Sequence, residues 1–442
     1  MKLLIVGGGG FRVPQVMSVL TGADLPLDLT EVCLYDVDRS RLDVMRAVVS
    51  QLNDSLPPVT TTTDLDEAVA GSSFIFSAMR IGGTCGRVLD ERVALDRGVL
   101  GQETVGVGGY AYALRTVPEA MRLARAVARL SPDAWVINFT NPAGIITQAM
   151  RTVHRNVVGI CDTPIGLIRR AAHITGLGPD VDYDYVGLNH LGWLRTLGTN
   201  GTNVLPDLLA SDDLSRFEEA RIIGLDWVRA TGYLPNEYLY YYYRNRESVA
   251  SISSGQTRGE FLDGQQSRFY EAAGSDHDHA GALWQASKDE REATYMAEAR
   301  TEGEERSEED MGGGYEHVAR DIMTALTTGT KATMILGVAN SDAGGDLLIP
   351  QLREDAIIEV PATVDATGIH PHRVAPLAGT ELGLVTSVKA CEELVVEAAL
   401  TGNKTLAWKA FASHPLVDSV AVAKDILDTY IEKNPDIAAT FA

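Results

Sequence analysis

A short apolar run that leads through four glycines into a helix opens the chain, and it restricts the possible fold more than any other feature. Residues 2–6 (KLLIV) have the continuous apolar pattern of a parallel strand that is buried on both faces. Apolar residues then recur at helical spacing from Val13 to Leu20, and Pro14 suits a first helical turn. A glycine turn in this place leaves bare backbone N–H groups at a helix N-terminus, where a pyrophosphate can bind.

A carboxylate at the end of the next predicted strand supports a dinucleotide site. Residues 31–36 (EVCLYD) are expected to form this strand, and Asp36 at its end can accept hydrogen bonds from ribose hydroxyls. The glycine pattern departs from GxGxxG because Arg12 stands at the third glycine position. A tight structural turn without a ligand is the alternative, but the strand context favours NAD. The predicted cofactor-binding residues are Gly7, Gly8, Gly9, Gly10 and Asp36.

Strands and helices continue to alternate through the first third of the chain. Strands are predicted at residues 73–79, 134–140 and 157–161, with an amphipathic helix before the second of them. This βαβ order predicts an α/β fold, with a Rossmann-like, doubly wound and mostly parallel sheet over residues 1–165. We expect this part to be the NAD-binding domain.

The pattern changes at residue 166. Helical segments dominate and are mixed with strand-like pieces at 333–338 and 356–364, which predicts a C-terminal mixed α+β domain over residues 166–442. We expect that domain to serve catalysis, substrate binding and oligomerisation. The charged segment 287–311 is predicted to be a solvated helix or a loop. The helix from Val388 to Ala398 is predicted to be the last of the chain.

The net charge of −22 over 442 residues limits the classes of partner. Such a surface repels nucleic acid and anionic membranes. An anionic substrate would need a local arginine pocket. No apolar run approaches the length of a membrane span, and four cysteines in so long a chain do not suggest a disulfide framework. These properties predict a cytoplasmic enzyme.

Two residues that follow predicted strands are candidate metal ligands. Cys161 ends VVGIC and His190 lies in GLNHLGW, and in an α/β sheet the ends of strands border the ligand cleft. A thiolate needs a positive neighbour, which a metal would provide. The alternative is that both are ordinary core residues, and the residues alone leave these two interpretations open. The other histidine pairs, in SDHDHAG and GIHPHR, are predicted to lie in polar loops.

Several longer motifs resemble one known family. The pieces are GGGG, GRVLDERVALDRGVLGQETVGVGGYAYALRTVP, NFTNPAG, GICDTPIG, GLNHLGW, PNEYLYYYY and QTRGEF, and they span about residues 5–265 in family order. The chain resembles the NAD-dependent and metal-dependent glycoside hydrolases of family 4, especially their 6-phospho-β-glucosidases. This family does not use the paired carboxylates of most glycosidases.

The resemblance implies roles for particular residues. Cys161 and His190 would hold a divalent metal, typically manganese, and Tyr238 would be the catalytic base. The residues implied to contact the sugar phosphate are Arg87, Asn141 and Arg258. The implied reaction hydrolyses a phosphorylated glucoside or disaccharide by oxidation at C3 with NAD, proton removal at C2, elimination, water addition and return of the hydride. A homodimer or homotetramer is expected.

Asp162 bears on the anomer. In the resembled family, β-type members carry Asn after the metal cysteine, whereas some α-type members carry an Asp that acts as an acid. The motifs GQETVGVGG and YLYYYY favour the β-type, so Asp162 is predicted to act as a catalytic-site group that orients the metal or its water. The alternatives are a 6-phospho-α-glucosidase, a plain NAD-dependent 2-hydroxyacid dehydrogenase, and an inactive NAD sensor.

Overall fold

Six parallel strands form the N-terminal half of the sheet, as the alternating pattern predicts. The structure is a computed structural model that describes residues 1–22, 25–52, 56–178, 181–293 and 314–442. The strands run in the order β6-β5-β4-β1-β2-β3. They are β1 (Lys2–Val6), β2 (Glu31–Tyr35), β3 (Val59–Thr62), β4 (Ser72–Ser77), β5 (Trp135–Asn138) and β6 (Val157–Gly159). The short polar β3 is the member that the sequence pattern did not predict.

Apolar residues on both faces of this sheet are buried, which confirms the doubly wound arrangement. Leu3 and Ile5 of β1 belong to one core, whereas Leu4 and Val6 belong to a second core on the opposite face. This alternation follows from the two-residue period of a strand. The helices of this half are α1 (Val13–Leu20), α2 (Arg39–Leu52), α3 (Leu65–Val69), α4 (Gly83–Leu95), α5 (Gly106–Leu130) and α6 (Ala143–Arg151).

The sheet continues into the C-terminal half through antiparallel strands, so its full order is β10-β8-β7-β12-β11-β6-β5-β4-β1-β2-β3. Helix α7 (Thr163–Ile174) leads from β6 into this half. Two hairpins form its centre, one from β7 and β8 and the other from β11 and β12. The additional strands are β7 (Asp182–Leu188), β8 (Leu191–Thr199), β9 (Thr202–Asn203), β10 (Leu234–Pro235), β11 (Ala332–Ala339), β12 (Ile357–Asp365) and β13 (Gly368–Pro371). The fold is thus α/β with a Rossmann-like part and a mixed C-terminal part.

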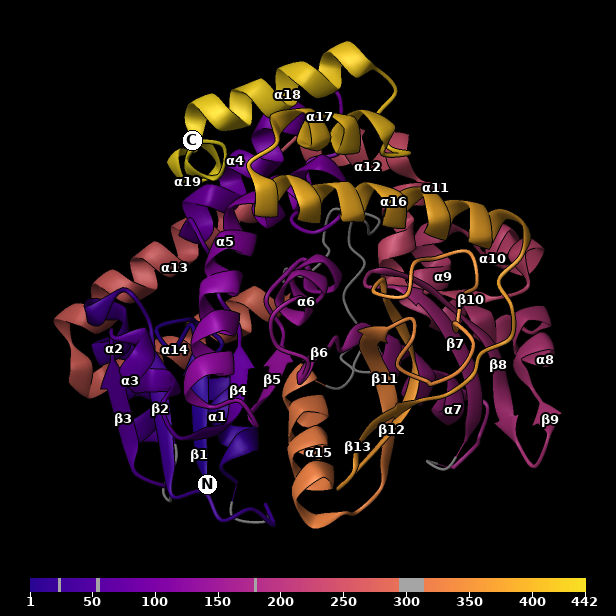
Figure 1. The fold of residues 1–442 in the computed structure, drawn as a ribbon. Helices are drawn as coiled ribbons and strands as arrows, with labels where there is room; N and C mark the ends of the chain where they lie inside the picture. Colours follow the sequence, from indigo (N-terminus) through magenta and orange to yellow (C-terminus); the bar gives the residue numbers. More distant parts are fainter. Residues whose placement is uncertain (23–24, 53–55, 179–180, 294–313) are drawn as a thin grey trace.

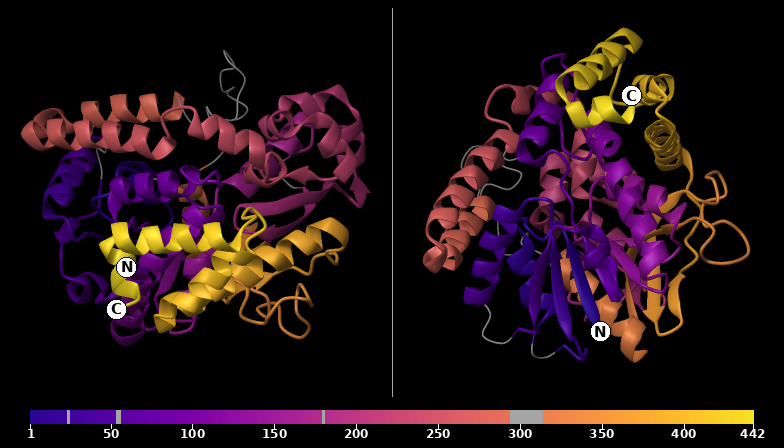
Figure 2. Two further views of the ribbon diagram at one scale, coloured as in Figure 1. Left: turned by 90° about the horizontal axis from the view of Figure 1, so that it is seen from above. Right: turned by 60° about the vertical axis from the view of Figure 1, so that its left-hand side comes forward.

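Short helices connect the strands of the C-terminal half, and two longer ones form a hairpin against α2 (Figure 2). The hairpin consists of α13 and α14. The helices after α7 are α8 (Leu205–Ala210), η1 (Asp212–Arg216), α9 (Glu218–Ile223), α10 (Leu225–Thr231), η2 (Glu237–Leu239), α11 (Tyr240–Tyr243), α12 (Asn245–Ser253), α13 (Arg258–Ser275), η3 (His277–His279), α14 (Ala280–Ala293) and α15 (Tyr315–Thr328). The predicted charged segment begins within α14, and its residues 294–311 lie outside the described part of the chain.

The C-terminus departs from the prediction. The helix expected to be last is α16 (Gly379–Thr401), but α17 (Lys404–Ser413), α18 (Val420–Lys433) and α19 (Pro435–Thr440) follow it. These helices lie together with α16 at the top of Figure 1 and pack on α4 and α5 of the N-terminal half. The chain therefore returns to its first half at its end, and the predicted division into residues 1–165 and 166–442 stays a prediction.

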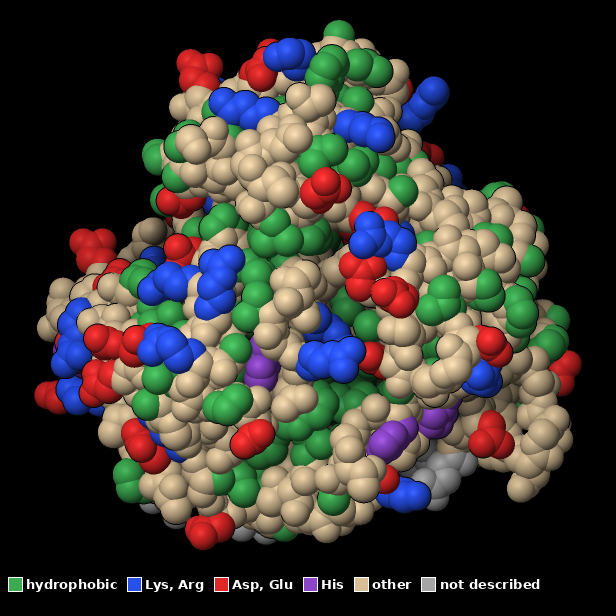
Figure 3. Space-filling view, viewed as in Figure 1, with side chains coloured by type: hydrophobic (Ala, Val, Ile, Leu, Met, Phe, Trp, Pro, Cys, Tyr) green, Lys and Arg blue, Asp and Glu red, His purple; other side chains and the backbone are tan. Residues whose placement is uncertain are grey.

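The surface shows acidic and basic side chains interspersed over the face in Figure 3. No helix among the described residues is long and apolar enough to cross a membrane. All four cysteines are free, as expected.

A row of four residues joins the two halves of the sheet. Gly159 of β6 pairs with Gly337 of β11, Gly337 pairs with Glu359 of β12, and Glu359 pairs with Gly187 of β7. The pairings of β6 with β11 and of β12 with β7 each consist of a single residue pair. Three of the four residues are glycines. A Cβ on Gly337 would lie 3.1 Å from the Cα of Gly159, which is too close for an ordinary contact.

Gly187→Ala should destabilise the protein, because the added methyl group would lie 2.1 Å from the carbonyl oxygen of Leu191 and 2.4 Å from the Cα of Gly192. Backbone atoms cannot rotate away as side chains can. We expect the free energy of unfolding in urea to fall by about 1–3 kcal/mol. The control is Gly178→Ala, since a Cβ there meets nothing within 4 Å. Equal stability of the two variants would contradict the close packing of Gly187 against the backbone of β8.

Candidate active site

The glycine-rich turn has the backbone geometry that the sequence predicts. Gly7 adopts a φ of +86°, and a Cβ there would lie 2.5 Å from the carbonyl oxygen of Ala78. Gly10 donates its N–H to the Gly7 carbonyl at 2.8 Å, which closes the turn. Gly7, Gly9 and Gly10 border a large cavity. Gly8 does not, because it packs against β2, where a Cβ would lie 2.7 Å from the Cβ of Leu34.

Asp36 lies at the mouth of the same cavity, just beyond β2. Its carboxylate accepts hydrogen bonds from the N–H groups of Gly9 and Asp38, each at 3.0 Å. Burial raises the pKa of this carboxyl, although the two hydrogen bonds oppose the rise. The residues present fit a dinucleotide: bare glycine backbone lies at the start of α1, and a carboxylate lies where a ribose would be expected.

The α13–α14 hairpin fixes the carbonyl groups of the glycine-rich turn. The hydroxyl of Tyr270 donates to the carbonyl of Gly9 at 2.7 Å, and the indole N–H of Trp284 donates to the carbonyl of Phe11 at 2.7 Å. The ring of Phe11 meets that of Phe269 edge to face, with centroids 5.4 Å apart. Sequence patterns did not assign this contact, because it joins segments more than 250 residues apart.

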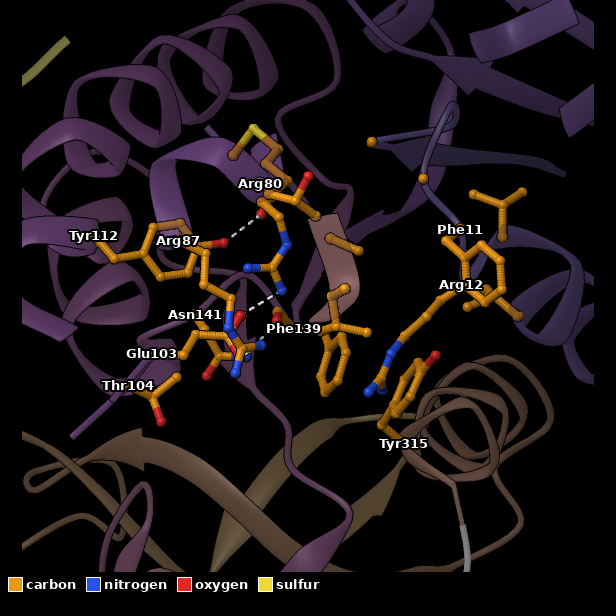
Figure 4. A pocket seen from close by; sticks show the side chains of 18 of the residues that line it. Phe11, Arg12, Arg80, Arg87, Glu103, Thr104, Tyr112, Phe139, Asn141 and Tyr315 are labelled. Atoms are coloured by element: carbon orange, nitrogen blue, oxygen red, sulfur yellow. Dashed lines mark hydrogen bonds and ion pairs between the residues drawn. The ribbon is translucent and has the colours of Figure 1, made fainter. Parts of the chain in front are cut away.

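One cavity of about 1120 Å³ brings together nearly all the predicted site residues, and Figure 4 labels Arg87 and Asn141 among those that line it. It extends from the glycine-rich turn to the loops after β6 and β7. The predicted residues that border it are Gly7, Gly9, Gly10, Asp36, Arg87, Asn141, Cys161, Asp162, His190, Tyr238 and Arg258.

Cys161 and His190 are both buried on the wall of this cavity. His190 occupies the tight turn between β7 and β8 with a φ of 64°, and its Nδ1 lies 2.8 Å from the hydroxyl of Thr104. This contact leaves Nε2 for a metal. Burial lowers the pKa of His190 to about 4, so the imidazole is neutral, as a metal ligand must be.

The Cys161 sulfur lies 3.4 Å from the hydroxyl of Thr163. Burial, Glu359 and Asp162 raise the pKa of the Cys161 thiol well above its ordinary value. A cation at this place would favour the thiolate. Among the described residues, no group of three or more His, Cys, Asp or Glu side chains is arranged to hold a metal ion. With two predicted protein ligands, a metal here would need substrate or water oxygens for its remaining positions.

Tyr238 lies directly against the predicted metal ligand. Its ring stacks on the His190 imidazole, with centroids 3.7 Å apart and planes within 8°. The turn that holds Tyr238 is fixed by Asn236, which accepts from the Tyr238 N–H at 3.0 Å and donates to Thr163 at 2.8 Å. Of the tyrosine run, only Tyr241 also borders the cavity.

Arg87 is surrounded by carboxylates. It donates to Glu91 at 2.7 Å and to Glu103 at 2.5 Å, and Glu103 also pairs with Arg80 (Figure 4). Burial alone would lower the pKa of Arg87, but Glu103 and Glu91 raise it. Burial would likewise raise the pKa of Glu103, yet Arg80 and Arg87 keep it well below its usual range.

A second group of cations lies nearer the glycine-rich turn. The guanidinium of Arg12 lies 5.1 Å from the ring centre of Tyr315, and Figure 4 shows these two side chains beside each other. Arg258 donates to the carbonyl of Arg291 at 2.9 Å. Arg12, Arg258 and Arg291 all border the cavity with Lys288. Burial, Arg12 and Arg258 lower the pKa of Arg291, which indicates a dense positive field.

Three residues of the cavity wall carry no role predicted from the sequence: Arg291, Tyr315 and Thr104. Thr104 lies within the quoted motif GQETVGVGG, which was the available signal. For Arg291 and Tyr315 no local signal existed. The other histidine pairs lie outside the cavity lining; His277 and His279 form the exposed turn η3, whereas His370 was wrongly predicted to lie in a loop and belongs to β13.

Comparison with known proteins agrees with this geometry. The model of the family 4 glycosyl hydrolases matches residues 2–177, and the model of the family 4 glycosyl hydrolase C-terminal domain matches residues 185–417. This chain belongs to glycosyl hydrolase family 4. It is therefore a glycosidase, and the resemblance seen in its motifs is confirmed.

Its relatives include enzymes for both anomers. The chain is 30% identical to 6-phospho-alpha-glucosidase 1 of Lacticaseibacillus paracasei, over 98% of this chain and 97% of that protein. The 6-phospho-beta glucosidase structure from Thermotoga maritima with NAD and glucose-6-phosphate matches with a TM-score of 0.83 and 26% identity, over 99% of both chains. A 6-phospho-alpha-glucosidase structure from gut microorganisms, also with NAD and glucose-6-phosphate, matches with a TM-score of 0.81 and 27% identity, over 98% of both chains.

Cys161→Ser should weaken Mn²⁺ binding and leave NAD binding nearly unchanged, because Cys161 lies on the part of the cavity wall with His190 and not at the glycine-rich turn. Loss of a direct ligand should cost at least the roughly 10–100-fold in affinity that follows from loss of an outer partner. Electron paramagnetic resonance of free Mn²⁺ measures the effect. Cys85→Ser is the matched control, since this exposed thiol does not border the cavity. Unchanged Mn²⁺ affinity in Cys161→Ser would rule out the assignment.

Proposed function

We propose that this protein hydrolyses 6-phospho-β-glucosides with the help of NAD and a divalent metal, with manganese as the first candidate. The observation that carries the proposal is the single cavity that places Cys161, His190 and Tyr238 opposite a dinucleotide-type glycine turn. Relatives of both sequence and structure act on 6-phosphoglucosides, and one Thermotoga maritima structure at 27% identity contains manganese, NAD⁺ and glucose-6-phosphate.

The charge of the cavity supports a phosphorylated substrate. The chain as a whole carries −22 charges, so an anionic sugar needs local cations. Arg80 and Arg87 are largely compensated by Glu91 and Glu103. The group around Arg258 is the better candidate to bind the phosphate, while Arg87 and Asn141 remain candidates for the sugar.

Each catalytic side chain has a task that its position permits. NAD would supply reversible oxidation at C3, and the metal would supply a Lewis acid that makes the C2 proton acidic. Tyr238 removes the C2 proton, and the His190 ring stacked on it fixes the direction of its phenol. Asp162 lies next to Cys161 on the cavity wall, where it would orient a bound metal or its water.

A 6-phospho-α-glucosidase is the second candidate, and one residue favours it. Asp162 stands where an acid for an α-linked leaving group would be expected, and it borders the cavity. The 30% identical relative is named for the α anomer. Action in the cytoplasm and assembly as a homodimer or homotetramer stay predictions.

The C2 proton should exchange with solvent during turnover. In heavy water the product should carry deuterium at C2, and Tyr238→Phe should lose both this exchange and hydrolysis, as measured by NMR of the product. Tyr243→Phe is the control, because Tyr243 does not border the cavity. Product without deuterium would contradict the proposed chemistry, and inactivity of Tyr241→Phe alone would move the base to Tyr241. Stoichiometric accumulation of NADH would instead indicate a dehydrogenase.

Nitrophenyl 6-phospho-α- and β-glucosides distinguish the two anomers. We expect the wild type to prefer the β substrate and Asp162→Asn to bind metal about 10–100-fold more weakly, with little dependence on the leaving group. If Asp162 were the acid of an α-glucosidase, Asp162→Asn would lose activity on poor leaving groups and spare nitrophenyl ones. A strong preference of the wild type for the α substrate would overturn the β assignment.

A further inference from the structure

A buried carboxylate that has no role in the proposed chemistry lies behind the active site. Glu359 is only 3% exposed and is the third residue of β12, within the row that joins the two halves of the sheet. Its two cross-strand neighbours, Gly337 and Gly187, have no side chains. A carboxylate in such a place costs free energy unless hydrogen bonds or ion pairs compensate for the lost water.

One hydrogen bond links Glu359 to the cavity. Its Oε1 accepts from the side-chain Nδ2 of Asn189 at 2.9 Å, whereas its buried Oε2 has no hydrogen-bond partner among the described residues. Asn189 borders the cavity and directly precedes His190 in the turn between β7 and β8. Glu359 itself does not border the cavity. Among the described residues its hydrogen-bond link to the cavity wall runs through Asn189, and its charge also raises the pKa of the Cys161 thiol.

This bond determines which end of the Asn189 amide faces the cavity. A carboxylate accepts hydrogen bonds, so the amide NH₂ points toward Glu359 and the carbonyl oxygen points away from it. Within the described part of the chain, no hydrogen bond to that Oδ1 is found.

A buried ion pair acts electrostatically on Glu359. Lys389 and Glu392 of α16 pair with each other, and Lys389 is only 1% exposed. A Cβ on Gly144 would lie 3.9 Å from Glu392 Oε2 and 3.7 Å from the Cβ of Asn189, so this pair belongs to the same buried region as Asn189. Burial raises the pKa of the Glu359 carboxyl to about 7, and Glu392 adds to the rise. The Asn189 hydrogen bond and the cationic Lys389 oppose it and so favour the ionised form.

We propose that Glu359 is a positioning residue, which turns the Asn189 carbonyl oxygen into the cavity so that it accepts a hydrogen bond from a hydroxyl group of the sugar. An amide oxygen suits a hydroxyl donor and not a phosphate dianion, which has only acceptors. The inference rests on the proposed function, because it takes the phosphorylated sugar as the ligand beside the Cys161–His190 pair.

Exchanging the hydrogen-bond donor and acceptor between positions 189 and 359 tests the positioning role of Glu359. Asn189→Asp places two carboxylates against each other, and Glu359→Leu removes the acceptor, so each should weaken glucose 6-phosphate binding by about 10-fold. In the double variant N189D/E359Q the donor and acceptor change places: the glutamine amide on β12 donates its N–H, and an oxygen of the new carboxylate again faces the cavity. Most of the lost affinity should return. A residue that only stabilised the fold would not give this reciprocal rescue.

Isothermal titration with glucose 6-phosphate, on the protein loaded with NAD and Mn²⁺, gives the affinities. Thermal unfolding and NAD titration of each variant show that the fold and the cofactor site are retained. Wild-type affinity in Asn189→Asp, or a double variant as weak as Asn189→Asp, would overturn the inference and leave the proposed function intact. A loss of NAD affinity in place of sugar affinity would overturn it too, and would assign the Asn189 oxygen to the cofactor. Failure of the wild type to bind glucose 6-phosphate would remove the proposed function and the inference together.

Discussion

The pairing of four strands at Gly159, Gly337, Glu359 and Gly187 is the constraint on which the active site depends. At this row the parallel N-terminal half of the sheet meets the antiparallel C-terminal half through one residue pair, Gly159 with Gly337, and β12 meets β7 through another. The loop with Cys161 follows one side of the row, and the turn with His190 follows the other. Glycine at positions 159 and 337 lets those two backbones approach, and the one side chain of the row, that of Glu359, holds the His190 turn through Asn189. The same pairing thus joins the two halves of the sheet and brings the two predicted metal ligands to one cavity.

The sequence predicted those parts of the fold that have a local signal. The strand β1, the glycine turn and helix α1 follow from hydrophobic period and glycine placement, and the structure confirms them. The short polar strand β3 was missed because it has little apolar content. The C-terminal helices α17–α19 were missed because the boundaries between helix and loop were not recognised there. The antiparallel link between the two halves has no local signal, since β6 and β11 are more than 170 residues apart.

The same distinction applies to the site. Cys161, His190 and Tyr238 could be selected because each stands in a recognisable motif, and the structure places all three on one cavity. Gly8 could not be separated from its neighbours by sequence, because only the packing against Leu34 turns it away from the cavity. Arg291 and Glu359 reach the site through long-range packing of α14 and β12. Neither could be found without the fold, although each bears directly on how charge is distributed around the ligands.

The chain as a whole is strongly negative, but the charges around the cavity form separate local groups. Carboxylates compensate Arg80 and Arg87, a second set of cations lies beside the glycine-rich turn, and the pair Cys161 and His190 is neutral without a cation. The most direct test of this account is a crystal structure with NAD, Mn²⁺ and glucose 6-phosphate, with anomalous data collected for manganese. We predict a manganese peak between the sulfur of Cys161 and Nε2 of His190, in contact with sugar oxygens. A manganese peak elsewhere, or a sugar phosphate bound away from this cavity, would contradict it.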